Sequence, residues 1–358
     1  MPDIELRLGH DMLVLSSPLD ATLARQGIDA ARDRQYLNLM EPDAIVDAFR
    51  LEMVAGAQCL VTTTEDITRA RLAHVRMEGD ASRLAKAAVD IASEMKPQHV
   101  LIEIGPCGLP LDVSSKASLN ESRQQYADAA RAFEGCAFDA FFLNGFASIA
   151  DLKCALMGVA QVSGKPIFAS VALGRNTGRD VEEIRTADSK TTGDKSSGDA
   201  PSGGASSSSG DTIFSLSYKP FDEPVAPAVP KLNALLDPDS WSEAIAAMVD
   251  LGASVVGFET ADPIDKAVAY AQQAVRESNL PMLAQLRVDG GASSADERAR
   301  SRMPLADRTD YSPDTLERAA VKLYGAGVQF LRASGAATPA CTGALAATVT
   351  GLDVLQRG

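Results

Sequence analysis

One unit recurs along this chain and constrains its fold: a helical pattern, a turn containing glycine, and a short run of β-branched or aromatic residues. Clear copies are Gly56 before Cys59–Thr64 and Gly135 before Ala140–Phe146. Glycine ends a helix in the left-handed conformation without steric cost, so a strand can begin at once. Strands that are apolar along most of their length are typical of parallel sheets, which are covered on both faces.

Eight such runs predict eight strands: Met12–Ser16, Cys59–Thr64, Val100–Ile104, Ala140–Phe146, Pro166–Val171, Ser254–Glu259, Met282–Arg287 and Val328–Ala333. The most periodic helices between them are Asp43–Val54, Ala81–Met95, Glu121–Glu134, Trp241–Leu251 and Pro313–Tyr324. Eight βα units in tandem is the number that closes a barrel. The alternative, an open doubly wound sheet, would typically have a glycine-rich first turn, and residues 16–20 contain no glycine. We therefore expect one α/β domain over residues 1–358, a TIM-type (β/α)8 barrel.

One interval, from Gly174 to Leu236, interrupts this rhythm after the fifth predicted strand. Its middle, residues 186–212, consists almost entirely of Ser, Gly, Thr, Asp, Ala and Lys. Such a composition buries too little apolar surface to offset the entropy of ordering it. We expect 186–212 to be a disordered, low-complexity insertion in a loop on the carboxyl-terminal face of the barrel, where barrel active sites lie.

The net charge indicates which partners the protein does not bind, and the cysteines indicate the redox state of its compartment. The net charge is −14, and such a surface repels nucleic acid and anionic membranes. No run of residues approaches the roughly 20 apolar residues that a membrane helix needs. The five cysteines are odd in number and form no C-x-x-C pair, which suits reduced thiols. We expect a cytoplasmic protein that binds neither nucleic acid nor membranes.

Short motifs stand at the ends of the predicted strands, in a fixed order. They are Val14–Leu23 (V-L-S-S-P-L-D-A-T-L), Gly56–Thr64 (G-A-Q-C-L-V-T-T-T), Ile104-Gly105-Pro106, Ala140–Lys153 (A-F-F-L-N-G-F-A-S-I-A-D-L-K) and Arg332–Pro339 (R-A-S-G-A-A-T-P). In order and spacing this set resembles the homocysteine S-methyltransferase family, which includes the first module of cobalamin-dependent methionine synthase. The resemblance implies a barrel and a methyltransferase that transfers a methyl group to the homocysteine thiol.

The resemblance also implies a zinc site, and this chain departs from it there. The family activates the substrate thiol on a zinc ion held by three cysteines, with the fourth tetrahedral position left for substrate. The corresponding positions here are Thr260, Ser334 and Gly335. None of them supplies a thiolate, so we expect a degenerate zinc site, no cofactor, and loss of the zinc-dependent activity.

Other polar residues stand at the strand ends and are candidates for binding a substrate. Arg287 and Arg332 end the seventh and eighth strands, where barrels often bind phosphate, and guanidinium groups suit carboxylates and phosphates. The alternative is that both arginines pair with Glu259 and Asp289 and only fill a vacated cavity. The predicted substrate-binding set is Thr62, Thr64, Asn144, Gln285, Arg287 and Arg332.

Two carboxylates, Glu103 and Glu259, are the catalytic candidates. Glu103 could serve as a general acid or base if it is buried, or it could pair with an arginine. Two hypotheses follow. The chain is a divergent S-methyltransferase-like enzyme that works without the three-cysteine zinc site, or it is a non-catalytic protein. In the second case it would bind a small anionic or amino-acid-like ligand and serve a corrinoid or folate methyl-transfer partner.

Overall fold

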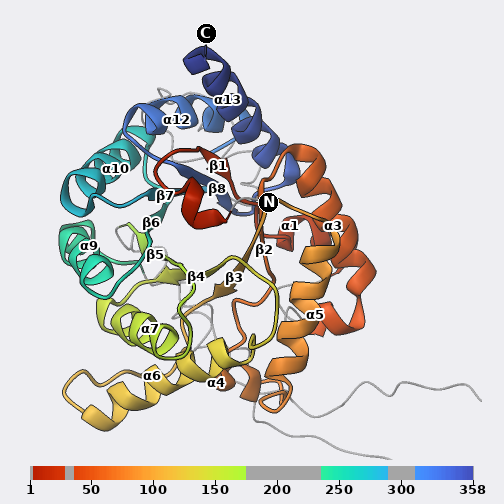
Figure 1. The fold of residues 1–358 in the computed structure, drawn as a ribbon, viewed down its shortest axis with the longest axis vertical. Helices are drawn as coiled ribbons and strands as arrows, with labels where there is room; N and C mark the ends of the chain where they lie inside the picture. Colours follow the sequence, from red (N-terminus) through yellow and green to blue (C-terminus); the bar gives the residue numbers. More distant parts are fainter. Residues whose placement is uncertain (1–2, 29–35, 175–234, 289–310, 358) are drawn as a thin grey trace, which may run out of the picture. The chain divides into compact units, whose positions relative to one another are not determined.

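The computed structural model describes residues 3–28, 36–174, 235–288 and 311–357. Eight parallel strands form one sheet in the order β1-β8-β7-β6-β5-β4-β3-β2, and helices ring the strands (Figure 1). The strands are β1 (Leu13–Val14), β2 (Cys59–Val61), β3 (His99–Ile104), β4 (Ala140–Phe146), β5 (Ile167–Leu173), β6 (Val255–Thr260), β7 (Met282–Val288) and β8 (Phe330–Gly335). The predicted eight-stranded α/β barrel is confirmed.

The ring closes between its first two strands. β1 pairs with β8 through Leu13 opposite Phe330, and a parallel bridge joins Leu15 to Cys59 at the start of β2. The Ser16 amide donates to the Cys59 carbonyl oxygen at 2.9 Å. An open doubly wound sheet has two free edges, so this bridge separates the barrel from the alternative that the sequence left open.

The described helices follow the predicted periodicity. They are η1 (Ile4–Arg7), α1 (Asp20–Arg25), α3 (Pro42–Ala55), α4 (Arg69–Ala73), α5 (Ala81–Glu94), α6 (Lys116–Arg131), α7 (Ile149–Val162), η2 (Pro238–Ser240), α9 (Trp241–Asp250), α10 (Ile264–Ser278), α12 (Pro313–Gly325) and α13 (Pro339–Arg357). α3 ends at Gly56 with φ of 103°, the left-handed cap predicted from the recurring glycine. α6 begins five residues earlier than predicted because the Ser115 side chain caps it by accepting the Ser118 amide. Among the described residues, no helix is long and apolar enough to cross a membrane.

The first two strands are shorter than predicted, although the Ser16 and Thr62 amides still donate to the backbone carbonyl oxygens of Cys59 and Leu101. Side-chain hydrogen bonds add to the backbone bonds at these two strand ends. The Ser16 hydroxyl oxygen accepts the Val61 amide at 2.9 Å, and Thr62 and Thr64 bond through their side chains. The barrel unit spans Met1–Arg175 and Val229–Gly358. The predicted insertion at 186–212 and residue Asp289 lie outside the described residues.

Two apolar layers hold the barrel together, one inside the strands and one between strands and helices. The inner layer includes Leu101, Phe142, Phe168 and Phe330, and the last two rings meet edge to face with centroids 4.9 Å apart. Ile4 of η1 belongs to this layer and is fully buried. The lower part of the lumen is therefore a packed core that η1 covers from below.

A glycine sets how closely α7 approaches α6. A Cβ atom placed on Gly158 would lie 2.5 Å from the Arg123 carbonyl oxygen and 2.9 Å from the Tyr126 Cβ. Gly158→Ala should lower the free energy of unfolding by about 1–3 kcal/mol through overpacking, although alanine favours helix by about 1 kcal/mol. Urea denaturation measures the change, with Gly164→Ala as the control, because a Cβ at that exposed glycine meets nothing within 4 Å. Equal effects of the two substitutions would contradict the close helix contact.

Candidate functional site

A buried arginine crosses the upper part of the lumen. Arg332 of β8 is 2% exposed, and its guanidinium faces the Glu103 carboxylate of β3, with Nη1 to Oε1 at 3.1 Å and Nη2 to Oε2 at 3.4 Å. The same group donates to Gln285 Oε1 at 3.2 Å and, through Nε, to the Ser16 carbonyl oxygen at 3.0 Å. Four of its five N–H groups are thereby used, so the arginine is held in place by β3, by β7 and by the segment that follows β1.

Amide side chains complete the network on the far side of Glu103. Asn144 of β4 donates to Glu103 Oε1 at 2.6 Å. Gln285 of β7 donates to Asn144 Oδ1 at 2.7 Å and to the Ser170 hydroxyl of β5 at 2.8 Å. Five strands therefore contribute to one polar layer. Because buried charges are costly unless they are paired and hydrogen-bonded, the ion pair and the hydrogen bonds around it are what allow this layer to stand above an apolar core.

Three threonines line the end of β2 beside Glu103. The Thr64 hydroxyl donates to the Glu103 carbonyl oxygen at 2.8 Å, and Thr62 Oγ1 lies 2.7 Å from Thr64 Oγ1. Thr63 points away from this pair, and its hydroxyl donates to Asn38 Oδ1 at 2.8 Å. The hydroxyl-rich segment therefore fixes the backbone of β3 at the level of the polar layer.

Glu103 and Arg332 line a cavity of about 20 Å³. That volume accepts at least one water molecule. The rest of the lining consists of Ser17, Pro18, Leu19, Asp20, Leu23, Leu37, Val61, Thr62 and Thr63. The cavity is therefore lined by charged, hydroxyl and apolar side chains together.

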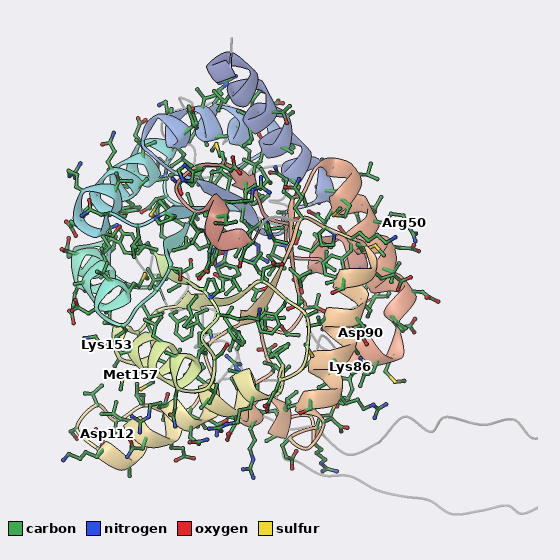
Figure 2. The ribbon with its side chains drawn as sticks, in the orientation of Figure 1. Arg50, Lys86, Asp90, Asp112, Lys153 and Met157 are labelled. Carbon is green, nitrogen blue, oxygen red and sulfur yellow. The ribbon has the colours of Figure 1, made fainter. Side chains whose placement is uncertain are left out.

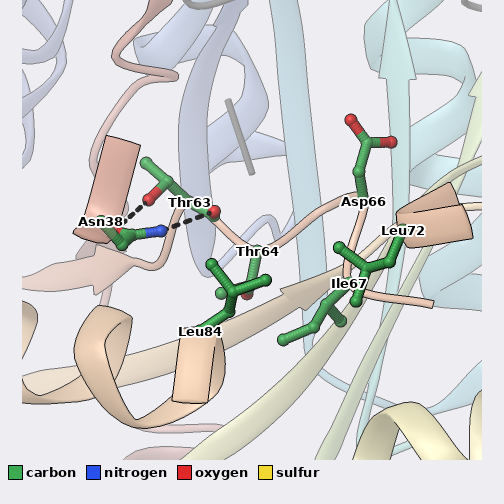
Figure 3. Close-up of a pocket in the computed structure, with 7 residues that line it drawn as sticks. All are labelled: Asn38, Thr63, Thr64, Asp66, Ile67, Leu72 and Leu84. Atoms are coloured by element: carbon green, nitrogen blue, oxygen red, sulfur yellow. Dashed lines mark hydrogen bonds between the residues drawn. The ribbon is translucent and has the colours of Figure 1, made fainter. Parts of the chain in front are cut away.

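A second cavity, of about 10 Å³, lies beside the first and shares Thr63 with it. Its lining is Asn38, Thr63, Thr64, Asp66, Ile67, Leu72 and Leu84. Figure 3 shows Asn38 bonded to both the hydroxyl and the carbonyl oxygen of Thr63. These two bonds hold Thr63, the residue that the two linings share.

The predicted substrate-binding residues divide into two groups. Thr62, Thr64, Asn144, Gln285 and Arg332 are all buried and meet in the polar layer or beside it. Arg287, at the end of β7, is partly exposed and has no hydrogen bond with another described residue. Their role in binding a substrate stays a prediction.

The two catalytic candidates also lie apart. Glu103 is the partner of Arg332, which is one of the two roles considered for it. Glu259 at the end of β6 instead accepts the Ser334 hydroxyl at 2.9 Å. The alternative in which Arg332 pairs with Glu259 does not apply, because the guanidinium of Arg332 faces Glu103 of β3.

A carboxylate that the sequence analysis missed lies behind the wall of the larger cavity. Glu52 of α3 is fully buried, and it accepts the Ser17 amide at 3.0 Å, the Ser17 hydroxyl at 2.6 Å and the Thr342 hydroxyl at 2.7 Å. Ile45, Ala48, Phe49 and Glu52 are the buried residues of α3. An acidic residue at this i, i+3, i+4, i+7 spacing was the signal that could have revealed it.

Burial raises the pKa of the Glu52 carboxyl, and the hydrogen bonds from Ser17 and Thr342 and the charge of Arg332 oppose that rise. A carboxyl with a raised pKa binds its proton more tightly in the folded chain than in the unfolded one. Its contribution to stability is therefore complete below the ordinary value of 4.5 and is lost as the pH rises through the raised pKa.

The three positions at which the family holds zinc do not fit that metal site. Thr260 Oγ1 accepts the Asp262 amide at 3.1 Å, and Ser334 is bonded to Glu259. Gly335 has φ of 66°, and a Cβ there would lie 2.6 Å from the Val288 carbonyl oxygen. No cluster of three His, Cys, Asp or Glu side chains suited to a metal occurs in the described part of the chain.

Arg332→Met should destabilise the fold strongly, by about 3–5 kcal/mol, because Glu103 is left buried without its counter-charge. The double variant Arg332→Met/Glu103→Leu should recover part of that loss, as measured by urea denaturation. Lys86→Ala is the control: Lys86 pairs with Asp90 at 2.8 Å on the exposed face of α5 (Figure 2), where such pairs contribute less than about 1 kcal/mol. Equal stability of the single and double variants would contradict the pairing.

Glu52→Gln should change how stability depends on pH. From pH 4.5 up to the raised pKa, the wild-type chain loses the contribution of Glu52 and the variant does not. The difference in free energy of unfolding should therefore shift toward the variant as the pH rises, as measured by denaturation at successive pH values. Asp90→Asn, at an exposed carboxylate, should show no such shift, and parallel curves for Glu52→Gln would refute the raised pKa.

Among solved structures, the chain is similar to the homocysteine methyltransferase MmuM from Escherichia coli. The metallated form matches with a TM-score of 0.60 at 12% sequence identity, covering 95% of this chain and 96% of that one. The oxidized form matches with a TM-score of 0.59 at 13% identity, covering the same shares of the two chains. At such identities the likeness shows the fold. A search of curated proteins finds no match.

These matches correct the prediction that the chain has no cofactor. The E. coli enzyme exists in a metallated form, so missing cysteines at three positions do not justify a general statement that no cofactor is used. What the described residues establish is narrower: Thr260, Ser334 and Gly335 do not form a site of three thiolates. Metal content is therefore a quantity to be measured on this protein.

The family itself is identified from the sequence. The model of the homocysteine S-methyltransferase family matches residues 13–194, just over half of the chain, and includes the first five strands of the barrel. The order of strand-end motifs, the closed barrel and the solved relatives agree with this match. The chain belongs to the homocysteine S-methyltransferase family.

Proposed function

We propose that this chain is a divergent member of its family that has lost zinc-dependent methyl transfer to homocysteine and retains a site for a small amino-acid-like ligand. The observation that carries the proposal is the Arg332–Glu103 layer with its cavity, in a barrel whose zinc positions hold Thr260, Ser334 and Gly335.

The chemistry of the three zinc positions supports the loss of activity. A thiol becomes a good nucleophile only as the thiolate, and a zinc ion stabilises that thiolate when three protein ligands leave one coordination position open. Thr260 and Ser334 offer neutral hydroxyl groups that already bond to Asp262 and Glu259. Neither hydroxyl replaces a thiolate as a ligand.

The cavity above the polar layer supports a binding role. Its lining carries both signs of charge, from Arg332 and Glu103, together with hydroxyl and aliphatic groups. A small ligand with an ammonium group and a carboxylate matches that combination of charges, and preorganised polar groups at the bottom of a cleft give orientation. A corrinoid or folate methyl-transfer partner and a cytoplasmic location stay predictions.

A methyltransferase assay tests the proposed loss of activity. The purified chain is mixed with homocysteine and with sulfonium, folate or corrinoid methyl donors, with and without added zinc, and methionine is quantified. We expect methionine formation at the rate of the mixture without protein. Zinc-stimulated methionine formation by the wild-type chain would contradict the proposal, as would one equivalent of zinc that the purified chain retains and a chelator removes together with activity.

A variant with restored cysteines provides the positive control. Thr260→Cys/Ser334→Cys should gain zinc affinity, measured by metal analysis, because two thiolates replace two hydroxyl groups. Adding Gly335→Cys should cost stability, since the new Cβ would meet the Val288 carbonyl oxygen. Binding of homocysteine to the wild-type chain, measured by calorimetry, tests the ligand site separately from the reaction.

A further inference from the structure

A polar contact lies at the lower end of the barrel, where the strands begin. η1 covers this end with Ile4, and Arg7 of the same helix reaches His99 at the start of β3, with Nη1 3.5 Å from Nε2. His99 is 1% exposed, whereas the Arg7 side chain is 16% exposed. The contact therefore joins a buried imidazole to a cation near the surface.

The neighbours of His99 decide which ring nitrogen carries the proton. Nδ1 lies 3.4 Å from Asp139 Oδ1 and finds no other partner among the described residues. A carboxylate favours a proton on the nitrogen that it faces, so neutral His99 carries its proton on Nδ1. Nε2 then offers its lone pair to Arg7, whose guanidinium can only donate. The neutral ring thus suits both of its charged neighbours.

The charged and titratable groups around His99 come from several elements. Among the described residues they are Arg7 and Asp11 of the η1 region, Cys59 of β2, Asp139 before β4 and Lys165 before β5. Burial acts to raise the pKa of the Asp139 carboxyl, but the bonds from His99 and from the Val100 amide outweigh it and hold that pKa below its ordinary value of 3.8. Burial raises the pKa of the Cys59 thiol, which stays neutral. Histidine is then the residue type in this cluster that ordinarily changes charge between about pH 5 and 8.

Protonation of His99 reverses its contact with Arg7. The added proton goes to Nε2, because Nδ1 already carries one, so an N–H group replaces the lone pair that faced the guanidinium. Two positive groups then lie 3.5 Å apart, and the Arg7 side chain must move away. On the other side of the ring, Asp139 pairs with the imidazolium and stabilises that charge inside the fold. The barrel can therefore keep the charged ring while η1 loses one attachment.

We propose that His99 is a pH-sensitive switch, which holds η1 on the lower end of the barrel when it is neutral and loosens η1 when it is protonated. Two attachments of this region do not depend on that charge: Ile4 is buried in the inner layer, and the Gly9 amide donates to Gln329 Oε1 at 3.0 Å. The change is therefore a local opening and not an unfolding of the barrel. It is independent of the proposed function, since the ligand cavity lies toward the other ends of the strands.

Hydrogen exchange followed by mass spectrometry tests the switch on the full chain, at about pH 8 and at about pH 5.5. The reporting amides bond to carbonyl oxygens of residues 3–7 and belong to Leu6, Leu8, His10 and Asp11. Dividing each measured rate by the intrinsic rate at the same pH gives a protection factor. In the wild-type chain this protection should fall roughly tenfold at the lower pH, because a hydrogen bond with a charged partner is lost and two like charges meet.

Two histidine variants separate the switch from other effects of acid. His99→Gln keeps a donor for Asp139 and an acceptor for Arg7 but does not titrate, so η1 should have equal protection at both pH values. His10→Gln is the matched control, because His10 is an exposed histidine in the turn that follows η1. That variant should show the same fall in protection as the wild-type chain.

Arg7→Met removes the charge that repels the imidazolium. Its η1 should be less protected than the wild-type helix at the higher pH, because the contact with His99 is missing, and should show no further fall at the lower pH. The Arg7 side chain is partly exposed, so this variant decides the question if His99→Gln fails to fold.

The amides of β7 (Met282–Val288) report on the barrel as a whole and should keep their protection at both pH values. A wild-type fall that β7 shares equally would indicate global unfolding and would overturn the switch. Equal protection of wild-type η1 at both pH values would do the same, as would a fall in His99→Gln or in Arg7→Met as large as in the wild-type chain. None of these outcomes bears on methyl transfer, which the assay with homocysteine decides separately.

Discussion

The ion pair between Arg332 and Glu103 is the interaction on which the upper half of the barrel depends. It joins β8 to β3 across the lumen, and the amides of Gln285 and Asn144 tie β7 and β4 to the same pair. The Phe142 ring belongs to the apolar layer, and its centre lies 5.3 Å from the Arg332 guanidinium. The pair therefore marks the boundary between the apolar core that holds the strands together and the polar layer at their carboxyl ends.

This arrangement explains how polar side chains can stand inside a closed barrel. Polar strand ends there face a space that water fills poorly, and unsatisfied polar groups in such a space are costly. The long side chain of Arg332 crosses that space and bonds to acceptors from β3, from β7 and from Ser16, which follows β1. The chain thus keeps the barrel of its family, with an arginine at the centre of the polar layer.

The sequence predicted the strand ends well and the pairing between them poorly. Asn144, Gln285 and Arg332 could be named because side chains alternate along a strand and the motifs mark where each strand ends. Which of them meet depends on the stagger between strands, which no local pattern encodes, so the carboxylate partner of Arg332 stayed open among Glu103, Glu259 and Asp289. For Glu52 the local pattern was sufficient, because its helical spacing places it on the buried face of α3. It was overlooked because glutamate is rarely fully buried.

The short helix η1 has a consequence for how molecules reach the site. Ile4 fills the lower end of the lumen, and Arg7 beside it pairs with Asp11 at 2.7 Å. Among the described residues, apolar side chains fill the lower end of the lumen, and the buried His99 at the start of β3 lies 3.5 Å from Arg7 of η1. A molecule that came through this end would have to displace η1, so we expect the polar layer to be reached from the opposite end of the strands.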